Sequence, residues 1–241
     1  MLYFFTDFGS QGPYIGQMKS KVLERAHSCQ VVDLMHDVPA YNVQAGAYLL
    51  AALSNHLAPD GVVVSVVDPK VGSDRKGLVL RANYRWFVGP DNGLFDIIAQ
   101  QAGSCHWYEI NYDVENLSRS FHGRDVFAPI ASKLVMDEPH EEYLTLIDRP
   151  KQYFDKSDLN EIIYIDQFGS LMTGLRAESL GGGTISIGKQ KLPRVNTFSD
   201  VAEGQPLFYE NSQGLIEIAV NCGSAQEMFS AKIGDEIRIN T

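Results

Sequence analysis

The distribution of apolar and polar positions divides the chain into two halves with different predicted secondary structure. In the first half, short apolar runs alternate with stretches in which apolar residues recur every three or four positions, the pattern of strands alternating with helices. The β-α-β-α-β order of the first elements predicts a mainly parallel sheet with right-handed crossovers. The predicted strands cover residues 2–5, 31–34, 62–67, 77–82, 86–88 and 107–110, and the predicted helices cover residues 14–26, 43–56, 96–102 and 121–135.

The second half of the chain has only short strand-like runs, separated by Gly, Asn and Ser turns. A stretch rich in charge and proline, between about residues 139 and 160, separates the two halves. Short strands of this kind are typical of a small β-barrel or sandwich. We therefore predict an α/β domain over residues 1–150 and a smaller all-β barrel over residues 160–241. The predicted strands of the second domain cover residues 162–165, 171–173, 184–187, 207–209, 215–220 and 236–239.

Composition and charge narrow the range of partners. Thirty acidic against twenty basic residues give a formal net charge of −10, which disfavours a nucleic-acid backbone or an anionic membrane. No basic segment precedes the first apolar run, and no apolar stretch approaches the ~20 residues that span a bilayer. We expect a cytoplasmic protein that binds a small molecule. The three cysteines are isolated in the sequence and are predicted to be buried thiols.

Acidic residues follow two of the predicted parallel strands. Asp68 comes after the apolar run 62–67, which should be buried on both faces, and Asp7 comes after the aromatic run at the start of the chain. The carboxyl ends of parallel strands meet at one edge of a sheet, where open α/β folds bind ligands. Arg75 follows Asp68 by seven residues. The pair predicts a site at this edge, and an Asp that caps a turn beside a surface Arg is the alternative.

The chain lacks the sequence motifs of several classes of enzyme. There is no Gly-x-Ser-x-Gly elbow and no glycine-rich phosphate loop, which disfavours covalent catalysis, NTP hydrolysis and nicotinamide chemistry. Two interpretations remain open. Asp68, Arg75 and His122, if they meet, could order and deprotonate a water molecule without a metal. A metallohydrolase could instead use hard or borderline ligands drawn from Asp7, Asp33, His36, Asp37, Asp68, Asp91, Asn92, His122 and Asp125.

Seven motifs, in order over nearly the whole chain, resemble the S-adenosyl-L-methionine (SAM) hydrolases that form adenosine. This SAM hydroxide adenosyltransferase family is related to the fluorinating and chlorinating enzymes. The resemblance implies a Rossmann-like α/β domain, a β-barrel domain and a homotrimer in which each site lies between the first domain of one subunit and the second domain of its neighbour. The motifs are TDFG at 6–9, YIGQMK at 14–19, VDPKVG at 67–72, FVGPDNGLF at 87–95, FHGRDVFAP at 121–129, IDQFG at 165–169 and NSQGLIEIAVNCGSA at 211–225.

The resemblance also implies a reaction and a set of site residues. Water or hydroxide would displace L-methionine from C5′ of SAM in line, with no cofactor and no metal, and Asp68, Arg75 and His122 match the catalytic positions. Asp7 matches the acid that holds the ribose hydroxyls. The residues that match adenosine-binding positions in the second domain are Phe168, Ser170, Ser212, Glu217 and Val220.

Three residues depart from the family pattern. Gly12 stands where an acid is usual, and Ser170 and Gly174 each replace a usual Asn. These changes leave open a second hypothesis, a SAM- or nucleoside-binding sensor with little turnover. A halogenase is disfavoured because a carboxylate such as that of Asp68 would repel a halide.

Overall fold

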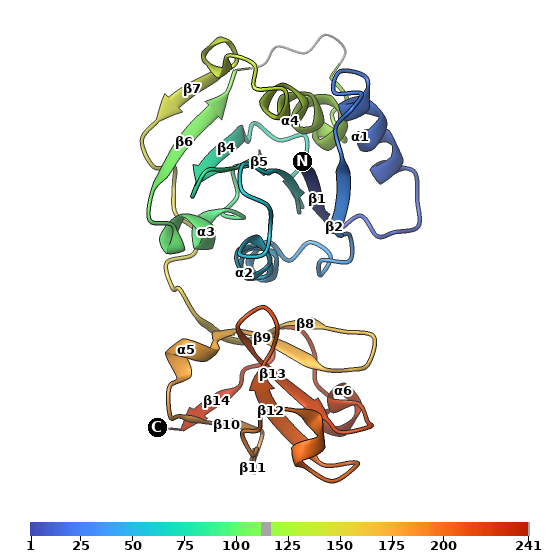
Figure 1. The fold of residues 1–241 in the computed structure, drawn as a ribbon, viewed down its shortest axis with the longest axis vertical. Helices are drawn as coiled ribbons and strands as arrows, with labels where there is room; N and C mark the ends of the chain where they lie inside the picture. The colour runs from blue at the N-terminus through green and yellow to red at the C-terminus, as the bar shows by residue number, and fades with distance from the viewer. Residues whose placement is uncertain (112–116, 241) are drawn as a thin grey trace. The chain divides into compact units, whose positions relative to one another are not determined.

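The computed structural model describes residues 1–111 and 117–240, which divide into two compact units, Met1–Asp155 and Lys156–Thr241 (Figure 1). The first unit contains one seven-stranded sheet in the order β2-β1-β3-β5-β4-β6-β7. None of the helices in the described part of the chain is long and apolar enough to cross a membrane. The strands of this sheet are β1 (Leu2–Thr6), β2 (Val31–Met35), β3 (Val62–Val66), β4 (Gly77–Ala82), β5 (Arg85–Pro90), β6 (Cys105–Ile110) and β7 (Leu144–Ile147).

The sheet is mixed, and the prediction of a mainly parallel sheet holds for one side of it only. Strands β2, β1, β3 and β5 run parallel, whereas β4, β6 and β7 pair antiparallel with their neighbours. The change of direction comes from the turn between β4 and β5. Asn83 and Tyr84 both have positive φ, 46° and 69°, the backbone conformation of a tight hairpin turn. Such a turn can only join antiparallel strands.

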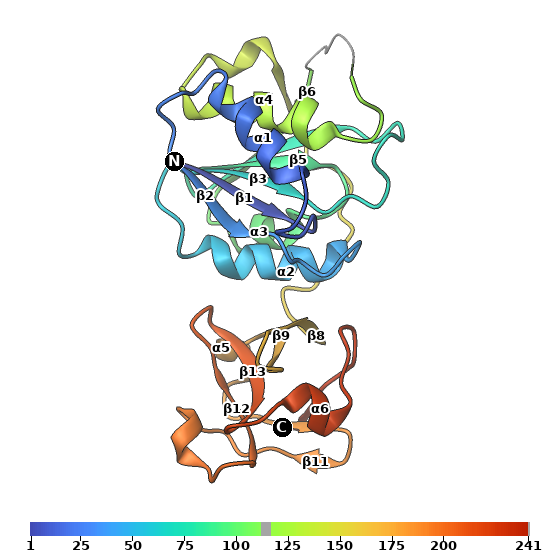
Figure 2. The same ribbon diagram turned by 90° about the vertical axis from the view of Figure 1, so that its right-hand side faces the viewer.

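Helices cover both faces of this sheet, with α1 and α4 on one side and α2 and α3 on the other (Figure 2). All five residues of β3 are buried between these layers, which confirms the prediction for this strand. The Asn42 side chain caps the start of the second helix by accepting the Ala45 N–H at 3.0 Å. The helices are α1 (Tyr14–Leu23), α2 (Val43–Ser54), α3 (Asp96–Gln101) and α4 (Ala128–Val135), with a π-helical turn (Gly123–Phe127) before α4 and a 3₁₀ turn at His140–Glu142.

Strand β7 lies in the stretch that the sequence assigns to the domain boundary. It is an edge strand paired only with β6, and it is short and half exposed: Leu144 is buried whereas Leu146 is 62% exposed. The alternation of buried and exposed residues in this strand is short, and charged residues and prolines flank it. The sequence pattern alone therefore does not predict the strand.

The second unit consists of two antiparallel sheets with strand orders β12-β13-β9-β8 and β11-β10-β14. Its all-β character is as predicted, but among its described strands no sheet closes on itself, so a barrel is not confirmed. The elements are β8 (Leu159–Ile165), β9 (Leu171–Arg176), α5 (Ala177–Leu180), β10 (Thr184–Ile187), β11 (Gln190–Lys191), a 3₁₀ turn (Phe198–Asp200), β12 (Pro206–Glu210), β13 (Leu215–Val220), α6 (Ala225–Phe229) and β14 (Arg238–Asn240).

The cysteines are less buried than predicted. Cys105 and Cys222 are exposed, and Cys29 is only partly buried. Cys105 is the first residue of β6, and Cys222 lies in the turn after β13 with a positive φ of 54°. Their position in the fold, and not the residue type, decides their exposure.

Candidate active site

Three acids lie at the carboxyl ends of the parallel strands. Asp7 follows β1, Asp68 lies two residues beyond β3, and Asp91 follows β5. Strands β1 and β3 are aligned with Thr6 opposite Val66, and the Asp7 N–H donates to the Val66 carbonyl at 3.4 Å. The Asn92 side chain donates to the Val67 carbonyl at 2.8 Å. The fold therefore places these acids at one edge of the sheet, as the sequence predicts.

Asp68 and Arg75 form a buried ion pair across their loop. The Arg75 Nη2 group donates to Asp68 Oδ2, and the two side chains are only 11% (Arg75) and 4% (Asp68) exposed. Burial lowers the pKa of the Arg75 guanidinium, and the negative charges of Asp68 and Asp91 oppose that shift. The alternative suggested by the sequence holds in part: Asp68 caps its turn, since Oδ1 accepts the Lys70 N–H at 3.2 Å, but its Arg partner is buried and not at the surface.

One nitrogen of the Arg75 guanidinium has no hydrogen-bond partner among the described residues. Its Nη1 group donates to the Lys76 carbonyl at 3.1 Å, whereas its buried Nε finds no partner among the described residues. A buried donor without a partner costs roughly 1–3 kcal/mol, so an acceptor at this position would be stabilised. The pair can hold a carboxylate charge in place and still offer a hydrogen bond.

Asp7 lies within electrostatic range of this pair. Burial raises the pKa of its carboxyl, the N–H of Tyr41 donated to Oδ2 at 2.9 Å opposes the rise, and the charge of Asp68 adds to it. Tyr41 has a positive φ of 63°, which is uncommon for a bulky residue, and its ring is 75% exposed. No sequence pattern reports a contact made by a backbone N–H.

His122 is half-buried, immediately before the π-helical turn. The ring of the preceding Phe121 contacts that of Phe8, with centroids 6.0 Å apart, and Phe8 follows Asp7. The segment just before Phe121 also contacts the Asp68–Arg75 loop: a Cβ on Gly72 would lie 2.3 Å from the Arg119 carbonyl oxygen. His122 is thus anchored beside both loops, although no hydrogen bond joins it to Asp68 or Arg75 in the described part of the chain.

A polar network supports the Asp7 loop from behind. The Thr6 hydroxyl lies 2.9 Å from His36 Nδ1, and His36 Nε2 lies 3.0 Å from Asp33. Lys19 Nζ reaches Asp33 at 2.6 Å, and the Gly9 N–H donates to the His36 carbonyl at 2.7 Å. Asp33 and His36, two of the candidate metal ligands, are therefore paired with each other and with an ammonium. Over the described residues, no group of three or more His, Cys, Asp or Glu side chains could hold a metal ion.

Replacing His36 with alanine is expected to lower the free energy of unfolding by about 1–3 kcal/mol, because the fully buried Thr6 hydroxyl loses the closer of its two partners and keeps only the Phe8 N–H at 3.4 Å. The midpoint of urea denaturation checks this. The matched control is His56→Ala, at an exposed position just beyond α2, which should change stability by less than about 0.5 kcal/mol. Equal effects of the two substitutions would show that the network contributes nothing.

A pocket of about 610 Å³ in the second unit collects most of the predicted adenosine-binding residues. Phe168, Ser170, Glu217 and Val220 line it, whereas Ser212 lies outside it, exposed in the turn between β12 and β13. The volume suits a small organic ligand. Sequence reasoning missed several lining residues, because Phe198 and Tyr209 come from separate strands and turns. The other lining residues are Asp166, Cys222, Gly223 and Ser224.

Glu217 is fixed by its own neighbours in this pocket. Tyr209 donates its hydroxyl to Oε1 at 2.5 Å, and the Asn211 amide donates to Oε2 at 2.9 Å. Burial and this hydrogen bond both raise the pKa of Tyr209, so it stays a donor. At the rim, the Asp166 carboxylate accepts the N–H groups of Phe168 and Ser170, and the turn presents a Phe168 ring that is 69% exposed. An exposed aromatic face beside fixed polar groups can stack on a flat ring.

The chain matches two family models that together span most of its length: the SAM hydroxide adenosyltransferase N-terminal domain over residues 2–143 and the corresponding C-terminal domain over residues 160–238. It is similar to the (R)-S-adenosyl-L-methionine hydrolases of Thermus thermophilus (34% identity, 99% of this chain and 98% of the relative) and Salinispora tropica (33%, 98% and 96%). A fluorinase of Actinopolyspora mzabensis is more distant, at 22% identity over 99% of this chain and 96% of the relative.

Solved structures also match over the full length. An uncharacterized conserved protein from Thermotoga maritima superposes with a TM-score of 0.91 at 32% identity, covering 100% of both chains. A conserved hypothetical protein from Thermus thermophilus gives a TM-score of 0.80 at 33% identity, covering 99% of both chains.

Proposed function

The chain belongs to the SAM hydroxide adenosyltransferase family, and we propose that it hydrolyses SAM to adenosine and L-methionine. The full-length similarity to several proteins named (R)-S-adenosyl-L-methionine hydrolase carries this conclusion. The buried Asp68–Arg75 pair at the ligand-binding edge of the sheet supports it chemically. The cytoplasmic location expected from the sequence stays a prediction.

The proposed reaction is an in-line displacement at C5′. The water oxygen forms a bond to C5′ while the C5′–S bond breaks, its electron pair remains on sulfur, and methionine leaves as a neutral thioether. Because the leaving group needs no acid, catalysis rests on placing and deprotonating the water. We assign Asp68 and His122 to accept or share the water proton and Arg75 to stabilise the developing hydroxide. The unpartnered Arg75 Nε is a donor suited to that task.

The charge of the site indicates which nucleophile it uses. A buried carboxylate repels an anion, so Asp68 disfavours a halide and favours neutral water, which it can also deprotonate. We assign Asp7 to the ribose hydroxyls, because its two oxygens can accept from a vicinal diol. Phe168, Ser170, Glu217 and Val220 would contact adenosine; Ser212, which lies outside the pocket, would have to act from its rim.

The direct test is incubation of the purified protein with SAM and a chelator, followed by chromatography. Adenosine and methionine in equal amounts are the expected products, and no metal is expected to be required. Tight SAM binding by calorimetry without product over hours would identify a sensor instead. Loss of activity with chelator, restored by a divalent ion, would identify a metallohydrolase.

We further propose a homotrimer in which the second-unit pocket of one subunit completes the first-unit site of its neighbour. This arrangement predicts complementation between two inactive variants, Asp68→Asn and Glu217→Gln. Mixed oligomers from co-expression with different affinity tags should regain activity, because some interfaces combine two intact halves. Activity no higher than that of either variant alone would contradict a shared site. Mixtures of two Asp68→Asn chains with different tags provide the baseline.

A further inference from the structure

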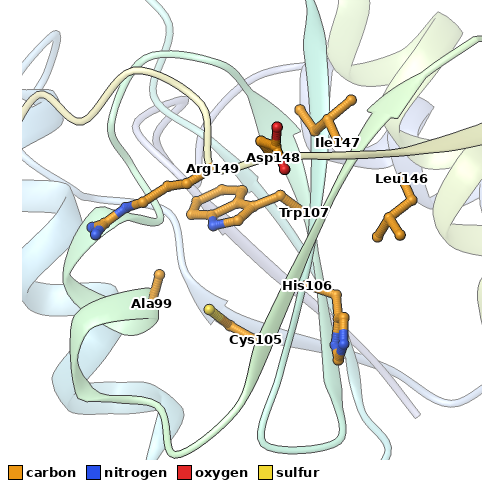
Figure 3. A pocket seen from close by; sticks show the side chains of 8 residues that line it. All are labelled: Ala99, Cys105, His106, Trp107, Leu146, Ile147, Asp148 and Arg149. Carbon is orange, nitrogen blue, oxygen red and sulfur yellow. The ribbon is translucent and has the colours of Figure 1, made fainter.

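The first unit contains a second cavity of about 530 Å³ that none of the proposed site residues lines. It lies beside α3 and the strands β6 and β7 (Figure 3). Its volume falls in the range of small-molecule sites. The lining residues are Ala99, Cys105, His106, Trp107, Leu146, Ile147, Asp148 and Arg149.

Trp107 supplies a buried donor at this cavity. Its side chain is buried, with an exposure of only 5%, and its Nε1–H has no partner within the described part of the chain. In Figure 3 the indole nitrogen faces the space between Arg149, Ala99 and Cys105. An unpaired buried N–H costs roughly 1–3 kcal/mol, so a hydrogen-bond acceptor placed in this space would be stabilised.

Arg149 adds a positive charge on the same side of the strands. Trp107 pairs with Ile147 across β6 and β7, and Arg149 follows Ile147 by two residues and extends past the indole ring. Among the described residues, no hydrogen bond or close ion pair engages its guanidinium. Burial raises the pKa of nearby Asp96, and the charge of Arg149 only partly opposes that rise. Asp96 Oδ2 is already engaged by the N–H groups of Tyr153 and Phe154, at 2.7 and 3.0 Å.

The apolar surface near the indole nitrogen comes from the Ala99 side chain and the face of the indole ring, and the Cys105 thiol lies on the same side. The one lining carboxylate, that of Asp148, lies on the other side of the ring from the indole nitrogen (Figure 3). The site thus combines two donors, one of them charged, with apolar surface. An acceptor that carries a negative charge on an apolar body satisfies both parts.

We propose that this cavity binds a small organic carboxylate, whose oxygens accept from Trp107 Nε1–H and the Arg149 guanidinium while its apolar part packs against Ala99 and the face of the indole ring. The proposal concerns a site separate from the SAM hydrolase site and does not depend on it.

Benzoate is a suitable probe, and the two tryptophans of the chain, Trp86 and Trp107, give two indole N–H signals in a ¹H–¹⁵N NMR spectrum. The titration is performed on the full chain with saturating adenosine, so that benzoate does not occupy the nucleoside pocket. The expected result is a saturable downfield shift of the Trp107 signal with the Trp86 signal unchanged. Neutral benzamide should bind at least about tenfold more weakly, as should benzoate to Arg149→Gln, because a charge-assisted hydrogen bond is lost.

The matched control is Arg81→Gln, which removes an arginine stacked 4.7 Å above Trp86 in the same sheet and should leave benzoate affinity unchanged. A Trp107 signal that does not move, or that moves equally in wild type and Arg149→Gln, would overturn the proposal. Inorganic phosphate binding as tightly as benzoate would overturn the assignment of an apolar ligand. Because SAM hydrolysis is assayed separately, a negative result here leaves the proposed function standing.

Discussion

Replacing Asp68 with asparagine is expected to lower kcat for SAM hydrolysis by about 10²–10⁴-fold, the usual contribution of a general base, while KM changes little. The substitution keeps the shape of the side chain but removes the charge that pairs with Arg75 and accepts a proton from water. Steady-state rates of adenosine formation check both parameters. His122→Ala should act in the same direction, because it removes the other proton acceptor assigned to this step.

Asp74→Asn is the matched control for Asp68. Asp74 lies on the same loop, exposed to solvent, and loses the same charge. It should leave kcat within about twofold, since an exposed charge is screened by water and salt. Near-normal turnover in Asp68→Asn, or an equal loss in Asp74→Asn, would remove Asp68 from the catalytic role. A rise in KM without a fall in kcat would make it a binding residue instead.

The placement of a site at the carboxyl edge of the sheet could be predicted because it depends on local sequence patterns. A continuous β-branched run marks β3 as a buried strand, and the acid at its end must then lie where parallel strands finish. The sequence could not tell whether Asp68 and Arg75 are buried. That property depends on segments distant in sequence: Arg119 lies against Gly72 in the loop between the two residues, and Asp91, just after β5, acts on Arg75 through its charge.

The features that sequence analysis missed depend on the backbone conformation of one turn or on pairing between distant segments. The antiparallel side of the sheet depends on the positive φ angles of Asn83 and Tyr84, which neither residue type requires. Strand β7 exists because β6 offers it a free edge. In the pocket of the second unit, strand register places Tyr209 opposite Glu217, and the ring of Phe198, from a 3₁₀ turn, packs on Tyr209 with centroids 5.2 Å apart.

Replacing Asp7 with asparagine is expected to weaken SAM binding without lowering the stability of the fold. Asp7→Asn should raise KM for SAM by about a hundredfold, because two hydrogen bonds from the ribose hydroxyls to a carboxylate, each worth roughly 1.5–3 kcal/mol, become weaker bonds to a neutral amide. The fall in kcat should be much smaller, since Asp7 does not touch the reacting atoms in the proposed scheme. Asp60→Asn, in the exposed turn before β3, is the control and should leave KM unchanged.

The stability of Asp7→Asn should equal or exceed that of the wild type. Burial raises the pKa of Asp7 in the folded protein, so its ionised form opposes folding at any pH above that value. Asparagine removes this cost, and its side-chain oxygen can still accept the Tyr41 N–H. At neutral pH the variant should unfold at the same urea concentration as wild type or a higher one. The advantage should vanish as pH falls below the ordinary range of an aspartate, where Asp7 is protonated in both states. A lower midpoint at neutral pH would mean that the carboxylate holds the loop together, and the loss of binding would then reflect disorder rather than a missing ribose contact.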